Sequence, residues 1–451
     1  MKFIIKDLNN KQKFLSERNF CILKMFKIKK PLENRNGTLY IGGASSLELA
    51  DKYDTPLYVY DEHRIRENFR NLYNAFHKNY PKFKLFYAIK ANNNLALIKI
   101  LKSEGAGIDV SGPAEIYLAK KVGFSKDKIL YSGVYHRNEE LKYALEQNVI
   151  INLEDVSQID RLFKFGSPKS LSFRINPGIG SGKFQGLVFA GPDAKFGIIE
   201  RDAITAYKKA KEHGVKSFGI HMMTGSCVLN ENYFVEVTEK LMDIAGNVSQ
   251  KLDIKFDFVD IGGGFGVPYQ PDEKELDINA VGKKVTGKFR EKIKQYSMGE
   301  PYLVAEPGRY LLCDSGILLT KVHSIKNGYK KFIGVDAGMN TMIRVAMYNA
   351  YHEILVANKL NDKPSEKVNI VGPVCENTDQ FAKDRIMPKI VEGDTLAILN
   401  VGTYGYGMSS QYNNRPRAAE VLVNKGKHEL IRKRDTFDDL VGNVVVPKRL
   451  G

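Results

Sequence analysis

The first part of the chain alternates short, β-rich hydrophobic runs with polar stretches whose apolar positions recur at helical spacing. Between residues 57 and 264 the β-rich runs are, in order, LYVYD, KLFYAIK, GIDVSG, ILYSG, VIINLED, SLSFRIN, SFGIHMM and FDFVDIGGG. Between them lie amphipathic stretches, among them 64–77, 93–103, 114–122, 138–147 and 231–251. This alternation is typical of parallel strands joined by helices. Eight such units favour a closed (β/α)8 barrel over an open sheet.

The hydrophobic pattern changes after the eighth run. The segment PYLVAEPGRYLL (301–312) has the character of another strand with a turn inside it. From 316 to 447, β-like segments follow one another closely with little helical patterning, which is typical of an antiparallel β domain. We therefore predict an α/β protein with a (β/α)8 barrel over residues 55–315 and a mostly antiparallel β domain formed by residues 36–54 and 316–451.

Residues 1–35 fit neither pattern. They are predicted to be an N-terminal extension, which is either disordered or the result of a true start at Met25. The first thirty residues hold no apolar core like that of a signal peptide, because charged residues interrupt every hydrophobic run. No stretch reaches the ~18 consecutive apolar residues that a membrane-spanning helix needs. We therefore expect a cytoplasmic protein that does not bind membranes.

The composition indicates which kinds of partner the protein is expected to bind, and says less about its fold. The chain has 451 residues, of which 43% are hydrophobic and 27% charged, and its net charge is +16. Its lysines are spread along the sequence beside acidic residues, and the one short basic cluster is 27–30. A solvated, lysine-rich surface is therefore favoured over nucleic-acid binding. The four cysteines form no CxxC pair and no zinc pattern, so we expect free thiols and no metal site.

Two features at the ends of predicted strands are candidates for chemistry. Lys90 ends the run KLFYAIK, and a lysine at a barrel mouth has a pKa that desolvation can lower, which favours imine formation; the alternative is an ordinary surface lysine. The glycine run IGGGFG (261–266) follows the predicted eighth strand, where barrels often bind phosphate. It does not match GxGxxG, so a dinucleotide fold is excluded, and a simple tight turn remains the alternative.

Two further motifs pair polar groups. EPGR (306–309) places a carboxylate and a guanidinium on either side of a Pro-Gly turn, although a surface ion pair would have the same pattern. CEN (375–377) places a thiol beside a carboxylate after a β-like run, and this cysteine could equally be a small core residue. Each motif alone is weak evidence.

Taken together, eight motifs occur in the order found in one family. They are YAIKAN (87–92), HMMTGS (221–226), IGGGFG (261–266), EPGR (306–309), DAGMN (336–340), IRVAMYNAYH (343–352), GPVCEN (372–377) and QYNNRP (411–416). In these motifs the chain resembles the alanine-racemase-like, fold-type III pyridoxal-phosphate decarboxylases, and among them the diaminopimelate decarboxylases. The resemblance runs from about Gly37 to Val446. It implies the decarboxylation of meso-2,6-diaminopimelate to L-lysine and CO2, the last step of lysine biosynthesis.

The resemblance also implies which residues bind pyridoxal 5′-phosphate. Lys90 would hold the cofactor as a Schiff base and exchange it for the substrate amine. Glu306 would face the pyridine nitrogen and keep it protonated, so that the ring accepts electrons. The remaining cofactor contacts implied are Ser226, Gly262, Gly263, Gly264, Arg309 and Tyr412.

The implied substrate contacts are Arg309, Arg344, Tyr348, Glu376 and Tyr412. Arg344 and Tyr348 resemble the pair that grips the distal carboxylate, and the planar guanidinium suits two parallel hydrogen bonds. Glu376 would bind the distal ammonium. Cys375 resembles the acid that protonates the carbanion, since a thiol is still largely protonated near neutral pH. In the family these last two residues enter the site from a partner subunit, so a homodimer with shared active sites is expected.

The chain departs from the family pattern at three places. Relatives commonly carry HxHxGS, with the second histidine stacked on the cofactor ring, whereas Met223 occupies that position here. A thioether can also contact an aromatic face, so we expect a subfamily variant, with His221 in the barrel interior and without a catalytic role. The loop 183–197 lacks the usual histidine, and Asn340-Thr341 replaces Asn-Asp. These two changes are expected to affect substrate positioning.

Other activities are compatible with the same fold. A decarboxylase of carboxynorspermidine, ornithine or arginine is the nearest alternative, but an unpaired buried guanidinium at Arg344 would be costly without a distal carboxylate to bind. A racemase is disfavoured because Cys375 and an arginine clamp suit protonation from one side. A non-catalytic pyridoxal-phosphate-binding homologue would have lost the lysine or the acid, and this chain has both.

Overall fold

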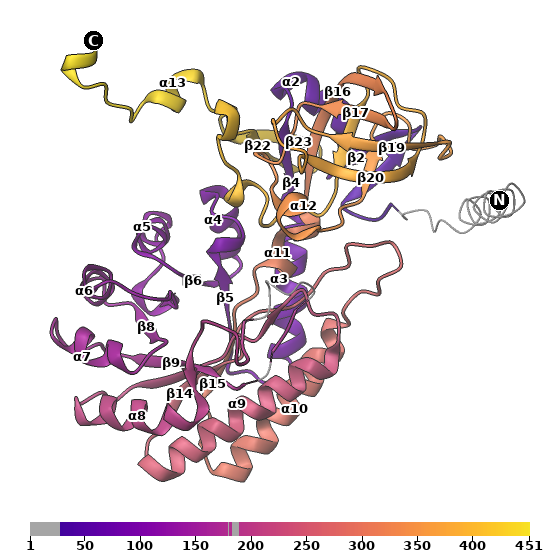
Figure 1. Cartoon of the computed structure of the whole chain (residues 1–451). Helices are drawn as coiled ribbons and strands as arrows, with labels where there is room; N and C mark the ends of the chain where they lie inside the picture. The colour runs from indigo at the N-terminus through magenta and orange to yellow at the C-terminus, as the bar shows by residue number, and fades with distance from the viewer. Residues whose placement is uncertain (1–27, 179, 183–188) are drawn as a thin grey trace, which may run out of the picture.

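The structure is a computed structural model that describes residues 28–178, 180–182 and 189–451. It has two bodies, a barrel of strands and helices and a β domain that covers one end of it (Figure 1). The predicted extension lies mostly outside the described residues, as does 183–188 of the variant loop. The predicted limit of the extension at residue 35 is too late, because Leu32–Arg35 already forms β1, paired with β2 (Thr38–Ile41).

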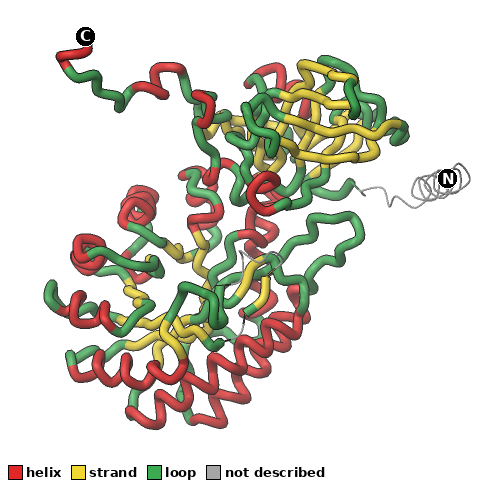
Figure 2. Tube along the Cα trace, viewed as in Figure 1, coloured by secondary structure: helices red, strands yellow, loops and turns green. Residues whose placement is uncertain are grey.

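Eight parallel strands form the barrel, and β8 pairs with β9 to close it. In order around the barrel they are β5 (Phe83–Ala88), β6 (Gly107–Val110), β7 (Ile129–Tyr131), β8 (Ile150–Leu153), β9 (Leu171–Asn176), β12 (Phe218–His221), β14 (Phe256–Asp260) and β15 (Tyr302–Ala305). Figure 2 shows these strands inside a layer of helices. The predicted (β/α)8 barrel is therefore confirmed.

The helices outside the barrel are α3 (Glu62–His77), α4 (Leu95–Ser103), α5 (Pro113–Val122), α6 (Asn138–Glu146), α7 (Ser157–Phe163), α8 (Ala203–Glu212), α9 (Glu231–Leu252) and α10 (Ile278–Tyr296). Their ends follow local sequence signals. The Asn94 and Asp277 side chains accept hydrogen bonds from the first backbone N–H groups of α4 and α10, which the helix itself leaves unpaired. Helix α5 starts at Pro113 and ends before Gly123, whose φ is +88°.

One predicted barrel strand is wrong. LYVYD is β4 (Leu57–Asp61), which pairs antiparallel with β16 and parallel with β22 in the β domain. The eighth barrel strand is instead β15, within the run read as a strand with a turn. All five residues of β4 are buried, and a strand buried on both faces reads as a continuous apolar run wherever it pairs. The local pattern therefore gave the number of strands but not their partners.

The β domain is a mixed, mostly antiparallel sheet, as predicted. Its strands are β4, β16 (Gly316–Asn327), β17 (Lys331–Val335), β18 (Ile354–Val356), β19 (Glu366–Val371), β20 (Gln380–Met387), β21 (Thr395–Ile398), β22 (Ala419–Asn424) and β23 (Lys427–Arg432). Strands β1, β2 and β3 (Ala44–Ser45) and helix α2 (Ser46–Tyr53) pack on it through Leu39, Ile41 and Leu49.

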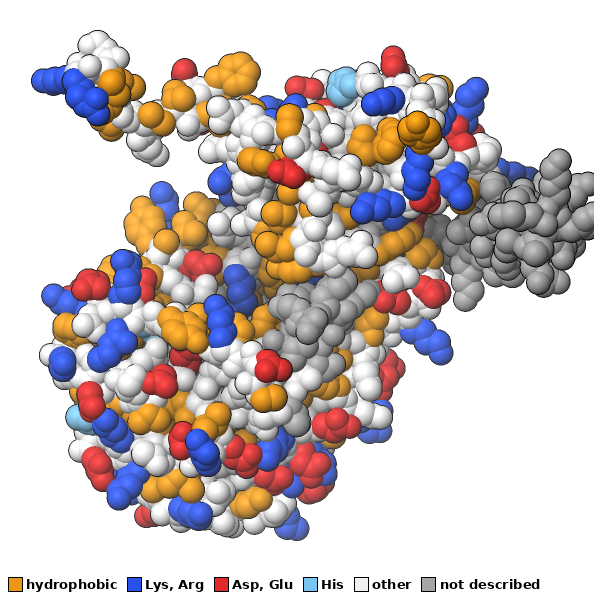
Figure 3. Space-filling view, viewed as in Figure 1, with side chains coloured by type: hydrophobic (Ala, Val, Ile, Leu, Met, Phe, Trp, Pro, Cys, Tyr) orange, Lys and Arg blue, Asp and Glu red, His pale blue; other side chains and the backbone are white. Residues whose placement is uncertain are grey.

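Short elements complete the described chain. They are β10 (Ser181–Gly182), β11 (Ile198–Ile199), β13 (Gly225–Ser226), α11 (Arg309–Leu312), α12 (Arg344–Tyr348) and α13 (Phe437–Val441). Among the described helices, none combines the length and the apolar character needed to cross a membrane. On the face shown in Figure 3, basic and acidic side chains are intermixed, without a large area of one sign.

Candidate active site

A cavity lies at the carboxyl ends of the barrel strands, where barrel enzymes place their chemistry. The residues that line it are Ala88, Lys90, Met223, Ser226, Cys227, Gly264, Phe265, Glu306, Gly308, Arg309 and Tyr404. They follow β5, β12, β14 and β15, except for Tyr404, which comes from the β domain. The cavity therefore brings together five of the predicted site residues: Lys90, Ser226, Gly264, Glu306 and Arg309.

Lys90 lies in a short 3-10 helix (Ile89–Ala91) directly after β5. Its Nζ is 3.0 Å from Oδ2 of Asp109, a buried carboxylate on β6. The Ser132 hydroxyl donates a hydrogen bond to the other oxygen of Asp109. Desolvation acts to lower the pKa of Lys90, but the charges of Asp109 and Glu306 outweigh it and raise the pKa above its ordinary value. The free amine is thus held as an ammonium at a fixed place.

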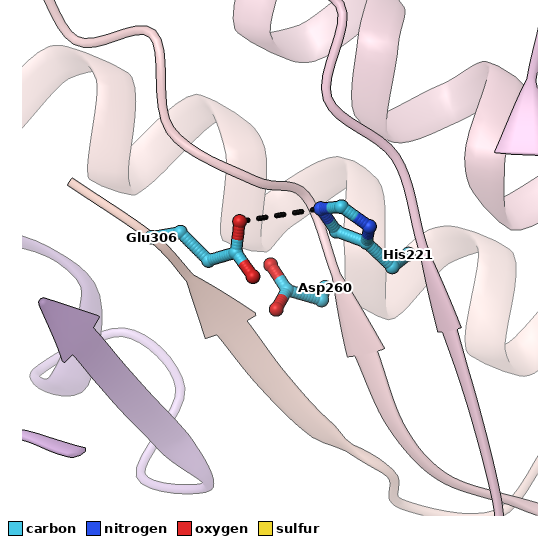
Figure 4. A group of neighbouring side chains, drawn as sticks. All are labelled: His221, Asp260 and Glu306. Carbon is cyan, nitrogen blue, oxygen red and sulfur yellow. Dashed lines mark ion pairs between the residues drawn. The ribbon is translucent and has the colours of Figure 1, made fainter. Parts of the chain in front are cut away.

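Three buried side chains meet on one side of the cavity, as Figure 4 shows. Nε2 of His221 lies 3.2 Å from Oε2 of Glu306, and Asp260 lies beside both, with one oxygen or nitrogen from each within 4.8 Å of the others. Burial would raise the pKa of Glu306, but His221 and Lys90 lower it to about 2. Burial and the charge of Glu306 raise the pKa of Asp260. Glu306 therefore carries the negative charge, and Asp260 holds the proton.

Glycines that follow β14 form a further wall of the cavity, and Gly264 lines it directly. Gly262 and Gly264 have φ angles of +69° and +95°, which side chains rarely adopt. A Cβ on Gly262 would lie 2.4 Å from the carbonyl oxygen of Met222, and one on Gly263 would lie 2.5 Å from that of Glu306. Only glycine can therefore follow this path, which brings the backbone of the loop directly against the residues that follow β12 and β15.

Arg309 supplies positive charge next to the glycines. Its guanidinium is buried, donates to the Tyr269 hydroxyl, and lies 3.4 Å from Oγ of Ser226. Its Nε has no hydrogen-bond partner among the described residues. A buried cation with an unpaired donor is a good receptor for an anion.

Comparison with known proteins agrees with this geometry. Residues 66–313 match the model of the pyridoxal-dependent decarboxylase family, pyridoxal binding domain. A diaminopimelate decarboxylase of Methanothermobacter thermautotrophicus is 50% identical over 419 residues, which are 92% of this chain and 98% of that protein. One of Archaeoglobus fulgidus is 36% identical over 424 residues, 92% and 99% of the two chains. The chain belongs to the diaminopimelate decarboxylase family.

A solved structure supports the same assignment. The diaminopimelate decarboxylase of Methanocaldococcus jannaschii, crystallised with L-lysine, superposes with a TM-score of 0.85 at 35% sequence identity. The match covers 93% of this chain and 98% of that one. It confirms the fold-type III architecture of a barrel followed by a β domain.

The residues of this decarboxylase fit a pyridoxal cofactor. Glu306 is an ionised carboxylate that lines the cavity, as expected of a partner for a protonated ring nitrogen. The glycine wall and Arg309 form an open, positively charged receptor for phosphate. Lys90 lies at the same cavity as both. One cavity therefore offers candidate residues for the Schiff base, for the contact with the ring nitrogen and for phosphate binding.

Met223 lines the cavity at the position where relatives of this decarboxylase commonly carry a histidine. Its Sδ accepts a hydrogen bond of 3.3 Å from the backbone N–H of Gly263. The thioether is thus held against the glycine wall beside Glu306 and Lys90. His221 is buried, in agreement with the predicted place in the barrel interior. The sequence did not indicate that it would contact Glu306, the residue expected to face the cofactor ring.

Tyr404 is a cavity residue that sequence reasoning missed. Its ring centroid lies 4.7 Å from the Arg309 guanidinium carbon. Tyr412, which the resemblance assigned to the cofactor, is 47% exposed and does not line the cavity. Its hydroxyl donates instead to Oε1 of Glu376, at 2.8 Å. Tyr404 lies between glycines and Tyr412 precedes two asparagines, in turns of the same loop. The local sequence therefore does not show which of the two tyrosines lines the cavity.

Arg344 lies on α12 and is 1% exposed. Its Nε–H donates to Nε2 of His352 at 3.3 Å, and its guanidinium carbon lies 5.3 Å from the ring centroid of Tyr269. Because Tyr269 also accepts from Arg309, both arginines contact the same tyrosine. Tyr348 ends the same helix and is half-buried. Neither Arg344 nor Tyr348 lines the cavity itself.

Cys375 and Glu376 lie on an exposed loop of the β domain, outside the cavity of their own chain. The backbone N–H of Cys375 donates to Oδ1 of Asn413 at 2.8 Å. The structure therefore does not bring these two predicted residues together with Lys90 within one copy.

Several buried charges near the cavity were not singled out from the sequence. They are Asp109, Arg174 and Asp260. Arg174, on β9, donates to the carbonyl oxygen of Met223 at 3.2 Å, and burial lowers its pKa to about 10. Each is a charged residue within a hydrophobic strand run: Asp109 in GIDVSG, Arg174 in SLSFRIN and Asp260 in FDFVDIGGG. A charge in such a run is a sequence signal that could have identified them.

Proposed function

We propose that this protein removes CO2 from meso-2,6-diaminopimelate to give L-lysine, with pyridoxal 5′-phosphate attached at Lys90. The observation that carries the proposal is the cavity itself. It combines an amine held by a buried carboxylate, an ionised glutamate, and an arginine beside a glycine wall. The relatives from Methanothermobacter thermautotrophicus and Archaeoglobus fulgidus are named diaminopimelate decarboxylases, which supports the proposal.

Pyridoxal phosphate, when bound, supplies an electron sink for the electrons left behind as CO2 departs. Glu306 serves this chemistry by presenting a negative oxygen to the ring nitrogen, while Asp260 and His221 hold the carboxylate in place. Arg309, Ser226 and the three glycines bind the phosphate. Asp109 fixes the ammonium of Lys90 near the carboxyl ends of β5 and β6.

Arg344 supports a substrate with a distal carboxylate. Its NH2 group is buried and has no hydrogen-bond partner among the described residues, and such a cation is costly unless an anion completes it. His352 accepts from Arg344 as a neutral imidazole, because burial and Arg344 itself lower the pKa of His352 to about 3, and it therefore adds no negative charge. We assign the distal carboxylate of diaminopimelate to Arg344 and Tyr348, and the distal ammonium to Glu376.

The proton that replaces CO2 requires a donor, and we assign it to Cys375. This thiol is exposed on its loop and lies outside the cavity of its own chain. We therefore propose a homodimer in which Cys375 and Glu376 of one copy complete the site built around Lys90 of the other.

The test is CO2 release and amino-acid analysis with meso-diaminopimelate, lysine, ornithine, arginine and carboxynorspermidine as substrates. We expect CO2 and lysine from diaminopimelate and little from the others. Arg344→Lys should raise KM for diaminopimelate about tenfold or more without loss of bound cofactor, because lysine cannot reproduce two parallel hydrogen bonds. The exposed Arg290, on α10, provides the matched control, Arg290→Lys. A preference for ornithine or arginine would contradict the substrate assignment.

The shared site has its own test. Lys90→Ala and Cys375→Ala homodimers should both be inactive, but mixed dimers contain one intact site if the two residues come from different chains. Random exchange should then restore about a quarter of the wild-type activity per subunit. If both residues served the same chain, mixing would restore none.

A further inference from the structure

The chain ends in a segment that leaves the folded body. We call residues 436–451 the C-terminal arm. From Thr436 onward its described hydrogen bonds lie within the arm itself, at the capping box of Thr436 and Asp439 and at two turns. Figure 1 shows the arm extending from the β domain away from both bodies.

The arm is unusually apolar for such a segment. Phe437 is 78% exposed and Val445 is 86% exposed. Four further apolar side chains of the arm are between 59% and 65% exposed: Val441, Val444, Val446 and Leu450. Figure 3 shows these hydrophobic side chains strung along the arm, with basic ones at its tip. Apolar side chains gathered on one exposed segment mark an interaction site.

The base of the arm is tied to one loop of the β domain. Oδ2 of Asp435 accepts hydrogen bonds from Nε2 of Gln411, at 2.8 Å, and from the backbone N–H of Arg417, at 3.3 Å. The same loop holds the segment with the candidate acid, because Tyr412 donates to Glu376 and Asn413 accepts from Cys375. The arm thus leaves the molecule beside the two residues that are proposed to enter a second copy.

We infer that the C-terminal arm docks on a second copy of this chain and clamps the dimer whose active sites are shared. The choice of a second copy rests on the proposed function, which places Cys375 and Glu376 at that interface. A stable interface buries about 800 Å² on each partner, and the arm adds apolar area to a base that is hydrogen-bonded to the loop holding Cys375. Through Asp435 and the loop 411–417, docking of the arm also holds Cys375 and Glu376 in position.

The experiment measures the dimer dissociation constant of the full holoenzyme by sedimentation over a concentration series. The variants are a chain that ends at Asp435 and the triple substitution Val444→Asp, Val445→Asp, Val446→Asp. Asn443→Asp is the matched control, since it adds a charge to the arm without removing an apolar side chain. Circular dichroism verifies that every variant is folded.

The truncation and the triple substitution should weaken the dimer about a hundredfold or more, and the control should change it less than about threefold. At concentrations where these variants dissociate, CO2 release should fall, and it should recover when the protein is concentrated. A wild type that is monomeric would overturn the inference, as would variants that dimerise like the wild type. If the wild type is active but the variants dimerise as it does, the role of the arm is refuted and the proposed function stands. If the dimer depends on the arm but the wild type releases no CO2 from diaminopimelate, only the proposed function is refuted.

Discussion

Nε2 of His221 lies 3.2 Å from Oε2 of Glu306, and both side chains are almost completely buried. Nδ2 of Asn152 lies 3.3 Å from the other ring nitrogen of His221. The ring of His221 thus lies between Asn152 and Glu306. Two strands, β8 and β12, thus orient the carboxylate that follows a third strand, β15. Glu306 itself lines the cavity in which the cofactor is proposed to bind.

This relationship predicts that His221 acts on the reaction through Glu306. His221→Phe keeps a ring but removes the polar group that faces Glu306, and kcat should fall about tenfold, the value of one polar contact to a buried charge. His221→Gln, which restores a polar group, should recover part of the loss. The exposed His63 provides the control, His63→Phe. A kcat unchanged by His221→Phe, with cofactor fully bound, would show that His221 is only a packing residue.

Tyr404 and Tyr412 should behave differently. Tyr404 lines the cavity beside Arg309, whereas Tyr412 is exposed and bonded to Glu376. Tyr404→Phe should therefore raise the Kd of pyridoxal phosphate about tenfold, and Tyr412→Phe should leave it unchanged. Fluorescence titration of the apoenzyme gives both constants. The opposite result would restore the tyrosine assignment that the sequence motif implied.

Asp109 should control the pH at which the apoenzyme accepts its cofactor. Attack on an aldehyde requires the neutral amine, and the charge of Asp109 raises the pKa of Lys90. Asp109→Asn should lower that pKa, so the reloading rate should rise at a lower pH than in the wild type. Stopped-flow absorbance from pH 6 to 10 measures the profile, and Asp127→Asn, an exposed carboxylate at the other end of the barrel, is the control. A profile that does not move would exclude this coupling.

Two buried histidines should make the fold sensitive to acid. Burial lowers the pKa of His352 to about 3, with a further contribution from Arg344, and lowers that of His136 to about 4. In the unfolded chain these histidines have a pKa of about 6.5. Below that pH the unfolded chain binds protons at these histidines and the folded chain does not, so the free energy of unfolding decreases as the pH falls. His352 alone should cost about 2 kcal/mol between pH 7 and 5.

Thermal unfolding of His352→Gln tests this loss. The variant should show a smaller decrease of Tm from pH 7 to 5 than the wild type, whatever its Tm at pH 7. The exposed His323, replaced in the same way, should keep the wild-type slope. An undiminished slope in His352→Gln would mean that His352 is already protonated in the folded protein.

Much of the fold follows from short-range pattern. Alternating β-rich and amphipathic runs were sufficient for the barrel, and closely spaced β-like runs were sufficient for the β domain. The position of β4 was not, because a fully buried strand carries no local mark of its partners. Likewise, Lys90 and Glu306 could be found from motifs, since each follows a strand directly.

The rest of the site depends on contacts between residues far apart in the chain. Asp109 is opposite Lys90, and His221 and Asp260 are opposite Glu306, only because neighbouring strands of a closed barrel end at the same level. Tyr404 reaches the cavity from the β domain. It is far in sequence from the barrel residues that it joins there, so no local motif could connect them. The exposure of Cys375 likewise depends on the tertiary arrangement of its loop.

The central claim is that Lys90 carries the cofactor in this cavity, and borohydride reduction of the holoenzyme followed by peptide mapping tests it most directly. Reduction should fix the pyridoxyl group on the peptide that contains Lys90, and Lys90→Ala should yield no such label and no CO2 release. A label on another lysine of the native enzyme, or decarboxylation by Lys90→Ala, would contradict the account.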